Sequence, residues 1–198
     1  MSAPRRIALF GGTFDPVHLG HVHLARQARE AAALDEVCFL PCRISPHKTG
    51  SRAAPAEDRL EMLRLATAGL GWATLDDFEL REPGPSYSYL TAEALTAREP
   101  EAEWFWVMGN DQWEALPRWR HPERLAARVT FLVLSRGGSP APREGFRMLP
   151  VAAGGHPASS TAIRASVAAG GARLDWLDPA VAGYIARKGL YREQGAVP

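Results

Sequence analysis

The sequence predicts an α/β fold: a Rossmann-like parallel sheet with helices on both faces and a small helical part at its carboxyl end. Short apolar runs alternate with longer stretches of helical character, which is the pattern of βαβ units. Right-handed crossovers would bring the carboxyl ends of the strands to one edge of the sheet, where ligands of such sheets bind. The chain has no internal repeat and no linker, so we expect residues 1–198 to form a single domain.

The amino-terminal half contains three expected strands and two expected helices. Residues 7–10 form an apolar run that ends at a glycine pair, and residues 19–33 are rich in alanine and free of proline, as in a helix. Residues 37–40 form a second apolar run, which stops at a proline. Residues 57–68 then place leucines on a helical period, and residues 74–78 are the third expected strand.

The carboxyl-terminal half continues the alternation of strands and helices. It has one expected helix at residues 88–98 and three expected strands at residues 104–108, 129–134 and 146–151. Two closing helices are expected at residues 159–169 and 179–188. The segment 136–145 is rich in glycine and proline and is expected to be a surface loop. The two closing helices would form the small helical part.

Composition and charge are those of an ordinary soluble globular protein, with 46% hydrophobic and 23% charged residues. The formal net charge of +1 gives no global basic field, so nucleic acid is not an expected partner. No segment approaches the ~20 apolar residues that cross a bilayer, and the amino terminus does not read as a signal peptide. Cys38 and Cys42 are expected to be free thiols. A cytoplasmic protein without membrane contact is therefore predicted.

The most informative segment joins the first strand to the first helix and reads GGTFDPVHLGH, from Gly11 to His21. Glycines at a strand end let a ligand approach the backbone closely. The amides that open the following helix suit an anion, helped by the positive end of the helix dipole. His18 lies three residues before His21, so the two imidazoles can share a face. Two such donors beside a phosphate site would stabilise charge in phosphoryl or nucleotidyl transfer.

This segment differs from a Walker A loop and from the G-x-G-x-x-G dinucleotide turn. Its His18-Leu19-Gly20-His21 element resembles the HxGH signature of a nucleotidyltransferase superfamily. The whole segment most resembles the bacterial nicotinate-nucleotide adenylyltransferases. That resemblance implies that His18 and His21 stabilise the triphosphate while an acceptor attacks the α-phosphorus of ATP, with no covalent intermediate. It also implies ATP-binding roles for the loop residues Gly11, Gly12, Thr13 and Phe14.

A second segment, SSTAIR at residues 159–164, resembles another motif of this family. As a helix start it offers a capping hydroxyl and outward amides, and Arg164 adds a charged fork that fits phosphate. We expect Ser160 and Thr161 to hold the triphosphate, with Arg164 among the catalytic residues. Gly109 and Asp111 resemble the family's GxD motif, whose carboxylate can accept hydrogen bonds from ribose, and Arg136 matches a basic position beside the nucleotide.

The acceptor side of the site is expected in three further segments. Residues 85–88 (PSYS) and 116–119 (LPRW) resemble family motifs that hold the pyridine nucleotide, which implies roles for Tyr87, Ser88 and a stacking Trp119. In a PHK element, Lys48 could reach a phosphate. The resemblance runs from about residue 7 to residue 191, with the motifs in the family's order. Its small departures are Ser88 in place of a threonine and an alanine before SST.

The resemblance implies that ATP and nicotinate mononucleotide react to give deamido-NAD and pyrophosphate in NAD biosynthesis. Mg²⁺ would enter with ATP and be held mainly by phosphates and water, since no carboxylate cage is apparent and no protein metal site is predicted. The alternatives are a phosphopantetheine adenylyltransferase, an adenylyltransferase that prefers nicotinamide mononucleotide, and a nucleotide-binding sensor without catalysis. The sequence predicts no oligomeric state.

Overall fold

The computed structural model describes residues 3–46, 53–171 and 173–192. Its centre is one sheet of six strands, in the order β3-β2-β1-β4-β5-β6, and every pairing in it is parallel. The strands are β1 (Arg6–Gly12), β2 (Glu36–Pro41), β3 (Ala73–Leu75), β4 (Glu103–Gly109), β5 (Thr130–Ser135) and β6 (Met148–Ala152). The predicted α/β fold with a Rossmann-like parallel sheet is confirmed.

Helices cover both faces of the sheet because successive residues of each strand point to opposite sides. In β1, Ala8 and Phe10 face one core, whereas Leu9 faces the other. The first core is closed by α1 (Leu19–Ala31) and α2 (Ala56–Thr67). The second is closed by α4 (Ser88–Thr96), α5 (Asn110–Ala115) and α6 (Pro122–Ala126). Apolar runs with no polar alternation are what a strand buried on both faces requires.

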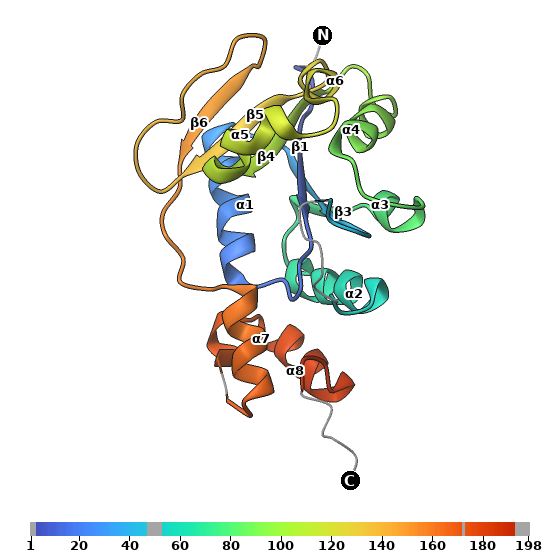
Figure 1. Cartoon of the computed structure of the whole chain (residues 1–198), viewed down its shortest axis with the longest axis vertical. Coiled ribbons are helices and arrows are strands. Elements are labelled where there is room, and N and C mark those ends of the chain that lie inside the picture. The colour runs from blue at the N-terminus through green and yellow to red at the C-terminus, as the bar shows by residue number, and fades with distance from the viewer. Residues whose placement is uncertain (1–2, 47–52, 172, 193–198) are drawn as a thin grey trace.

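The expected carboxyl-terminal helical part consists of α7 (Ser160–Ala168), the 3₁₀ turn η2 (Arg173–Trp176) and α8 (Pro179–Lys188). Figure 1 shows α7 and α8 at one end of the molecule, below the loop that joins β1 to α1. Ile163 of α7 and Val181 of α8 are fully buried in the first core. This part of the chain therefore packs at the carboxyl end of β1, where the Gly11 to His21 segment lies.

The sequence predictions differ from the structure in the short elements. The strand expected at residues 74–78 ends at Leu75, because Asp76 Oδ1 accepts a hydrogen bond from Phe78 N (2.8 Å) at the start of α3 (Phe78–Arg81). The last strand begins at Met148 and not at Phe146, which instead bridges to Arg143. Also unpredicted were α3, α5, η1 (Leu116–Arg118), α6 and η2, which are too short to show a helical period.

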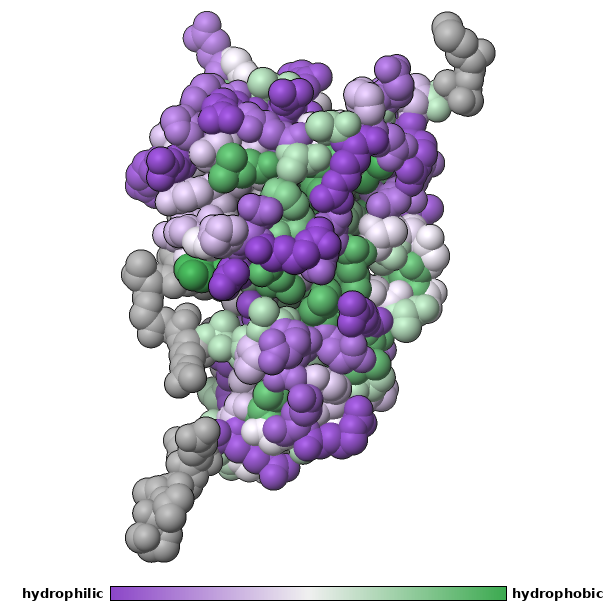
Figure 2. All heavy atoms as spheres, turned by 90° about the vertical axis from the view of Figure 1, so that its right-hand side faces the viewer, coloured by the Kyte–Doolittle hydropathy of each residue, from purple (hydrophilic) through white to green (hydrophobic). Residues whose placement is uncertain are grey.

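Charged pairs cross an apolar hollow beside α4. Ile7, Leu9 and Leu95 lie in its floor, and its volume is about 340 Å³. Arg5 pairs with Glu36 (2.6 Å) and with Glu99 (2.8 Å) at the rim. Figure 2 shows hydrophobic residues between hydrophilic ones on the side of the molecule that carries α3 and α4. In β1 and β4 the hollow involves residues that precede the last part of each strand, away from the glycines that end them.

The described residues include no membrane-spanning helix and no disulfide. Among the described residues, no helix is long and apolar enough to cross a membrane. Cys38 and Cys42 are both buried and form no disulfide. Burial raises the pKa of the Cys38 thiol to about 12, so this thiol stays protonated at neutral pH.

Candidate active site

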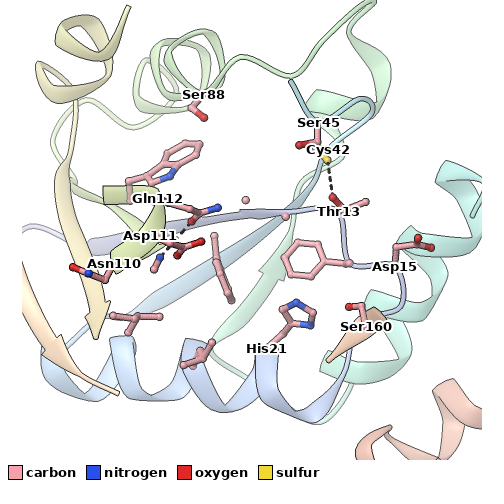
Figure 3. A pocket seen from close by; sticks show the side chains of 18 of the residues that line it. Thr13, Asp15, His21, Cys42, Ser45, Ser88, Asn110, Asp111, Gln112 and Ser160 are labelled. Carbon is pink, nitrogen blue, oxygen red and sulfur yellow. Dashed lines mark hydrogen bonds between the residues drawn. The ribbon is translucent and has the colours of Figure 1, made fainter. Parts of the chain in front are cut away.

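A cavity of about 840 Å³ opens at the carboxyl ends of β1 and β4. These strands are neighbours, and the order of the sheet reverses between them, which is where open parallel sheets bind ligands. Figure 3 shows Asn110 and Asp111 on one side of this cavity, His21 and Ser160 on another, and Ser88 across from them. The predicted site residues that line it are Gly11, Gly12, Thr13, Phe14, His21, Ser88, Gly109, Asp111, Trp119, Arg136, Ser160, Thr161 and Arg164.

The two histidines of the HxGH element stack face to face, with ring centroids 3.7 Å apart. His21 lines the cavity, whereas His18 lies behind it and is only 9% exposed. The prediction that the imidazoles share a face is confirmed, but only one of them faces the cavity in this structure. Gly20 makes the stack possible, because a β-carbon there would lie 3.0 Å from the His18 ring.

His18 is held as a neutral imidazole. Burial lowers its pKa from 6.5 to about 4, with a smaller contribution from nearby His156. Its Nδ1 is buried and has no hydrogen-bond partner among the described residues. A protonated ring would be costly in these surroundings. At neutral pH His18 therefore adds no positive charge beside His21.

The hydrogen bonding of His21 fixes its tautomer. Its Nδ1 accepts a hydrogen bond from His18 N at 3.2 Å, across the first turn of α1. A ring nitrogen that accepts carries no proton, so a neutral His21 is protonated at Nε2. The side chain thus presents an N–H donor from Nε2, at a place where the ring borders the cavity.

The loop after β1 is fixed by a buried arginine that the sequence did not identify. Arg59 of α2 is 2% exposed. Its Nη1 donates to Thr13 O (2.9 Å) and to Cys42 O (2.8 Å), and its Nε donates to Ala54 O (3.0 Å). One guanidinium thus joins the loop after β1, the end of β2 and the segment before α2. Nothing in the sequence around Arg59 distinguishes it from a solvated helix arginine; its contacts with the distant Thr13 and Cys42 do.

The loop also packs closely on itself and carries a buried carboxylate. A β-carbon at Gly12 would lie 2.9 Å from the Phe14 ring, so this position requires glycine. Asp15, 7% exposed, follows in the loop and precedes a cis proline. Its carboxylate accepts from Tyr191 Oη (2.8 Å) and Ala54 N (3.0 Å). Asp15 and Tyr191 were not among the predicted site residues, because their contact spans almost the whole chain.

Helix α7 is attached to the same loop by the residues of the SSTAIR segment. Ser159 caps the helix by accepting from Ala162 N (3.5 Å), as expected for a hydroxyl residue. Ser160 Oγ donates to Pro16 O (3.0 Å), and Arg164 Nη1 donates to Asp15 O (2.7 Å). The amides that open α7 and the Arg164 side chain therefore border the cavity beside His21.

The opposite wall begins where β4 ends. Gly109 precedes α5, and Asp111 lies in the first turn of this helix with its side chain exposed. Asp111 lines the cavity, as does Arg136, which follows β5 and is also exposed. The carboxylate lies at the carboxyl edge of the sheet, as the sequence predicted, where it can accept hydrogen bonds from hydroxyl groups of a bound nucleotide.

The acceptor side of the cavity is formed by α4 and η1. Ser88, the first residue of α4, and Trp119, which follows η1 and is partly exposed, both line the cavity. Ser86 Oγ accepts from Arg43 N (3.0 Å), which holds this segment against the chain that follows β2. Glu79 of α3 also lines the cavity; it is 5% exposed and accepts from Thr91 Oγ1 (2.7 Å). Burial raises the pKa of this carboxyl group.

One predicted residue lies away from the cavity lining, and another lies outside the described residues. Tyr87 does not line the cavity: its ring lies under the Arg120 guanidinium, 5.0 Å from the ring centroid, and its hydroxyl is 3.4 Å from Arg120 Nη1. The reason is that Tyr87 is the residue before α4, so its side chain leaves the chain in another direction from that of Ser88. Lys48 lies outside the described residues.

Comparison with known proteins identifies the relatives of this chain. Residues 9–166 match the cytidylyltransferase-like family. A probable nicotinate-nucleotide adenylyltransferase of Gloeobacter violaceus is 38% identical over 197 residues, covering 94% of this chain and 96% of that protein. One from Thermus thermophilus is 38% identical over 187 residues, covering 94% and 100%.

The fold has counterparts among solved structures. The nicotinic acid mononucleotide adenylyltransferase of Plasmodium falciparum, solved in complex with NaAD, has a TM-score of 0.75 at 18% identity, covering 94% of this chain and 97% of that one. At that identity the likeness shows the fold. Fold, cavity and sequence relatives agree, and the chain belongs to the nicotinate-nucleotide adenylyltransferase family of the cytidylyltransferase-like enzymes.

Proposed function

We propose that this cavity binds MgATP and nicotinate mononucleotide side by side and transfers the adenylyl group between them. A phosphate oxygen of the mononucleotide attacks the α-phosphorus of ATP. The new P–O bond forms as the bond to pyrophosphate breaks, which gives deamido-NAD and pyrophosphate. The observation that supports this is a single cavity that joins the phosphate-type wall of His21, Ser160 and Arg164 to the wall of Ser88 and Trp119.

The triphosphate is assigned to the wall made by α1 and α7. Helix α7 begins at the cavity with Ser160 and Thr161, so its first amides and positive dipole end border it, whereas α1 contributes His21 from its first turn. His21 would donate from Nε2 to a phosphate oxygen on which charge builds up during transfer. Arg164 adds a fixed positive charge from the opposite helix. His18 would act with His21 by holding its ring in place through the stack and through the His18 N–H.

The adenosine and its metal ion are assigned to the end of the cavity that Asp111 and Arg136 border. Asp111 would accept from ribose hydroxyls, and the Gly11 to Phe14 loop would lie against the phosphates. Mg²⁺ enters with ATP as part of the substrate. Asp111 is the one exposed carboxylate among the described residues that line the cavity, so oxygens of the phosphates and water would supply most of the ion's ligands.

The pyridine ring is assigned to Trp119, against whose partly exposed face it would stack. The ring carboxylate would be received by the amides at the start of α4, at Ser88, where the helix dipole favours an anion. Those donors fit a carboxylate better than an amide group, which supports nicotinate over nicotinamide.

Lys48 is proposed to contact a phosphate of the acceptor. The two unbridged cysteines accord with a cytoplasmic location.

The test is pyrophosphate release from MgATP with each of three acceptors: nicotinate mononucleotide, nicotinamide mononucleotide and phosphopantetheine. ATP without an acceptor is the control. We expect nicotinate mononucleotide to give the highest kcat/KM, with deamido-NAD and pyrophosphate formed in equal amounts. Equal or faster turnover on either other acceptor would contradict the substrate assignment. Turnover on none of them would contradict the proposal that the chain is catalytic and favour a nucleotide-binding sensor.

A further inference from the structure

The carboxyl-terminal end of the described chain contacts the loop that precedes the HxGH element. Tyr191 Oη donates to Asp15 Oδ1 at 2.8 Å, across 176 positions of sequence. Asp15 lies two residues after Thr13 and borders the cavity, whereas Tyr191 does not. The contact therefore reaches the loop from outside the cavity.

The carboxylate of Asp15 is a junction for three segments. Besides Tyr191, its Oδ1 accepts from Ala54 N (3.0 Å), and its Oδ2 lies 3.6 Å from Arg164 Nη1. Arg164 also donates to the Asp15 carbonyl oxygen at 2.7 Å. A shift of this carboxylate would displace both the loop backbone and the guanidinium that borders the triphosphate wall.

The surroundings of Tyr191 maintain this hydrogen bond, because they keep the hydroxyl protonated and hold the side chain in place. Its side chain is partly buried against the first core, and the loss of solvent there together with the charge of Asp15 raises the pKa of the phenol far above the usual range, so the hydroxyl keeps its proton. Its backbone lies in the left-handed region at φ 64°, which residues other than glycine rarely adopt. It follows Gly189, which ends α8, and Leu190 N donates back to Ile185 O (3.1 Å). The turn thus directs the phenol at Asp15.

We propose that Tyr191 is a positioning residue for ATP: its hydroxyl orients the Asp15 carboxylate, which in turn fixes the loop after β1 and Arg164. This inference rests on the proposed function, in which that loop and Arg164 hold the triphosphate. The acceptor side has no direct part in this junction, so loss of the hydroxyl should impair ATP and spare the mononucleotide.

The chain offers a matched control for Tyr191→Phe. Tyr184 lies in the same helical part, and its hydroxyl likewise donates to a buried carboxylate, Asp58 Oδ1, at 2.6 Å. Asp58 lies on α2 and also pairs with Lys188 (3.1 Å), away from the cavity. Tyr184→Phe therefore deletes the same chemical group and the same kind of hydrogen bond without touching the ATP loop.

Steady-state kinetics should be measured at a temperature where circular dichroism shows every variant folded. Tyr191→Phe should lower kcat/KM for ATP roughly tenfold, as expected for one hydrogen bond to a charged group, and leave KM for nicotinate mononucleotide within about twofold. Tyr184→Phe should leave both within about twofold. Equal loss in both variants, or equal loss toward both substrates, would overturn the inference, since a purely structural role predicts either.

Two further measurements separate this inference from the proposed function. Calorimetric titration with a non-hydrolysable ATP analogue should show weaker binding by Tyr191→Phe even if no acceptor is turned over, and unchanged affinity would overturn the inference. In an Asp15→Ala background, which removes the acceptor, Tyr191→Phe should have little further effect, because Tyr191 acts through that carboxylate. Additive effects would show that it acts by another route and would also overturn it.

Discussion

Replacement of Arg59 by methionine tests the claim that one buried guanidinium holds the active-site loop. The side chain is 2% exposed and donates three hydrogen bonds, all to backbone carbonyls of other segments. Methionine has a similar length and fills much of the same space, but it has no donor. The carbonyls of Thr13, Cys42 and Ala54 would lose these donors in a buried region.

The size of the effect follows from those three carbonyls. Each buried carbonyl left without its donor costs about 1–3 kcal/mol. Removing the guanidinium also returns part of its own desolvation cost, which amounts to several kcal/mol for a buried ion. We therefore expect Arg59→Met to lower the free energy of unfolding by about 3–4 kcal/mol, within the range for breaking a buried charged contact. Domains are stable by about 5–15 kcal/mol, so the variant should still fold but unfold at a lower urea concentration than the wild type.

The matched control is Arg64→Met on the same helix. The Arg64 side chain is 61% exposed, and its contact with Glu61 is an exposed ion pair at 3.4 Å, so its loss should cost less than about 0.5 kcal/mol. Urea unfolding followed by circular dichroism and tryptophan fluorescence gives both values by linear extrapolation. A loss for Arg59→Met within about 1 kcal/mol of that for Arg64→Met would refute the reasoning.

Two other predictions concern the pocket and the buried histidine. Trp119→Ala should raise KM for nicotinate mononucleotide about tenfold, the value of one aromatic stack, and change KM for ATP by less than about threefold; equal increases would contradict the assignment of Trp119 to the acceptor. His18 has a folded-state pKa of about 4 against 6.5, so the unfolded chain takes up a proton first as pH falls. The contribution of His18 to the free energy of unfolding should therefore stay constant above pH 6.5 and fall by up to about 3 kcal/mol toward pH 4. His18→Gln should remove that part of the slope in urea titrations at a series of pH values, and an unchanged slope would contradict the buried neutral state.

Much of the fold could be predicted from the sequence because strands that are buried on both faces have continuous apolar sequences. The runs around Leu9, Phe39 and Phe131 all became strands, and the helix boundaries fell within two residues or so of those expected. The short helices α3, α5 and α6 were missed for a physical reason. One or two turns do not show a period, and a local hydrogen bond such as that of Asp76 to Phe78 N decides where the chain turns.

The residues of the cavity wall could be predicted where they lie close together in the sequence, as in the HxGH element. Gly20 and His21 are neighbours in sequence, and the close contact of Gly20 with the His18 ring explains why the motif needs a glycine. Tyr87, predicted to hold the pyridine nucleotide with Ser88, is not among the residues that line the cavity, and its role stays a prediction. The contacts that Arg59 and Tyr191 make with the active-site loop could not be predicted, since they join segments that are distant in the sequence.

The most direct test of the central claim compares two histidines of α1 in deamido-NAD formation from MgATP and nicotinate mononucleotide. His21 lines the cavity, whereas His23 does not. His21→Ala should lower kcat roughly 100- to 1,000-fold, the usual effect of removing a donor to a transition-state oxygen, while its unfolding midpoint stays near that of the wild type. His23→Ala should keep kcat within about threefold. A His21→Ala enzyme as active as the His23→Ala enzyme would contradict adenylyl transfer in this cavity.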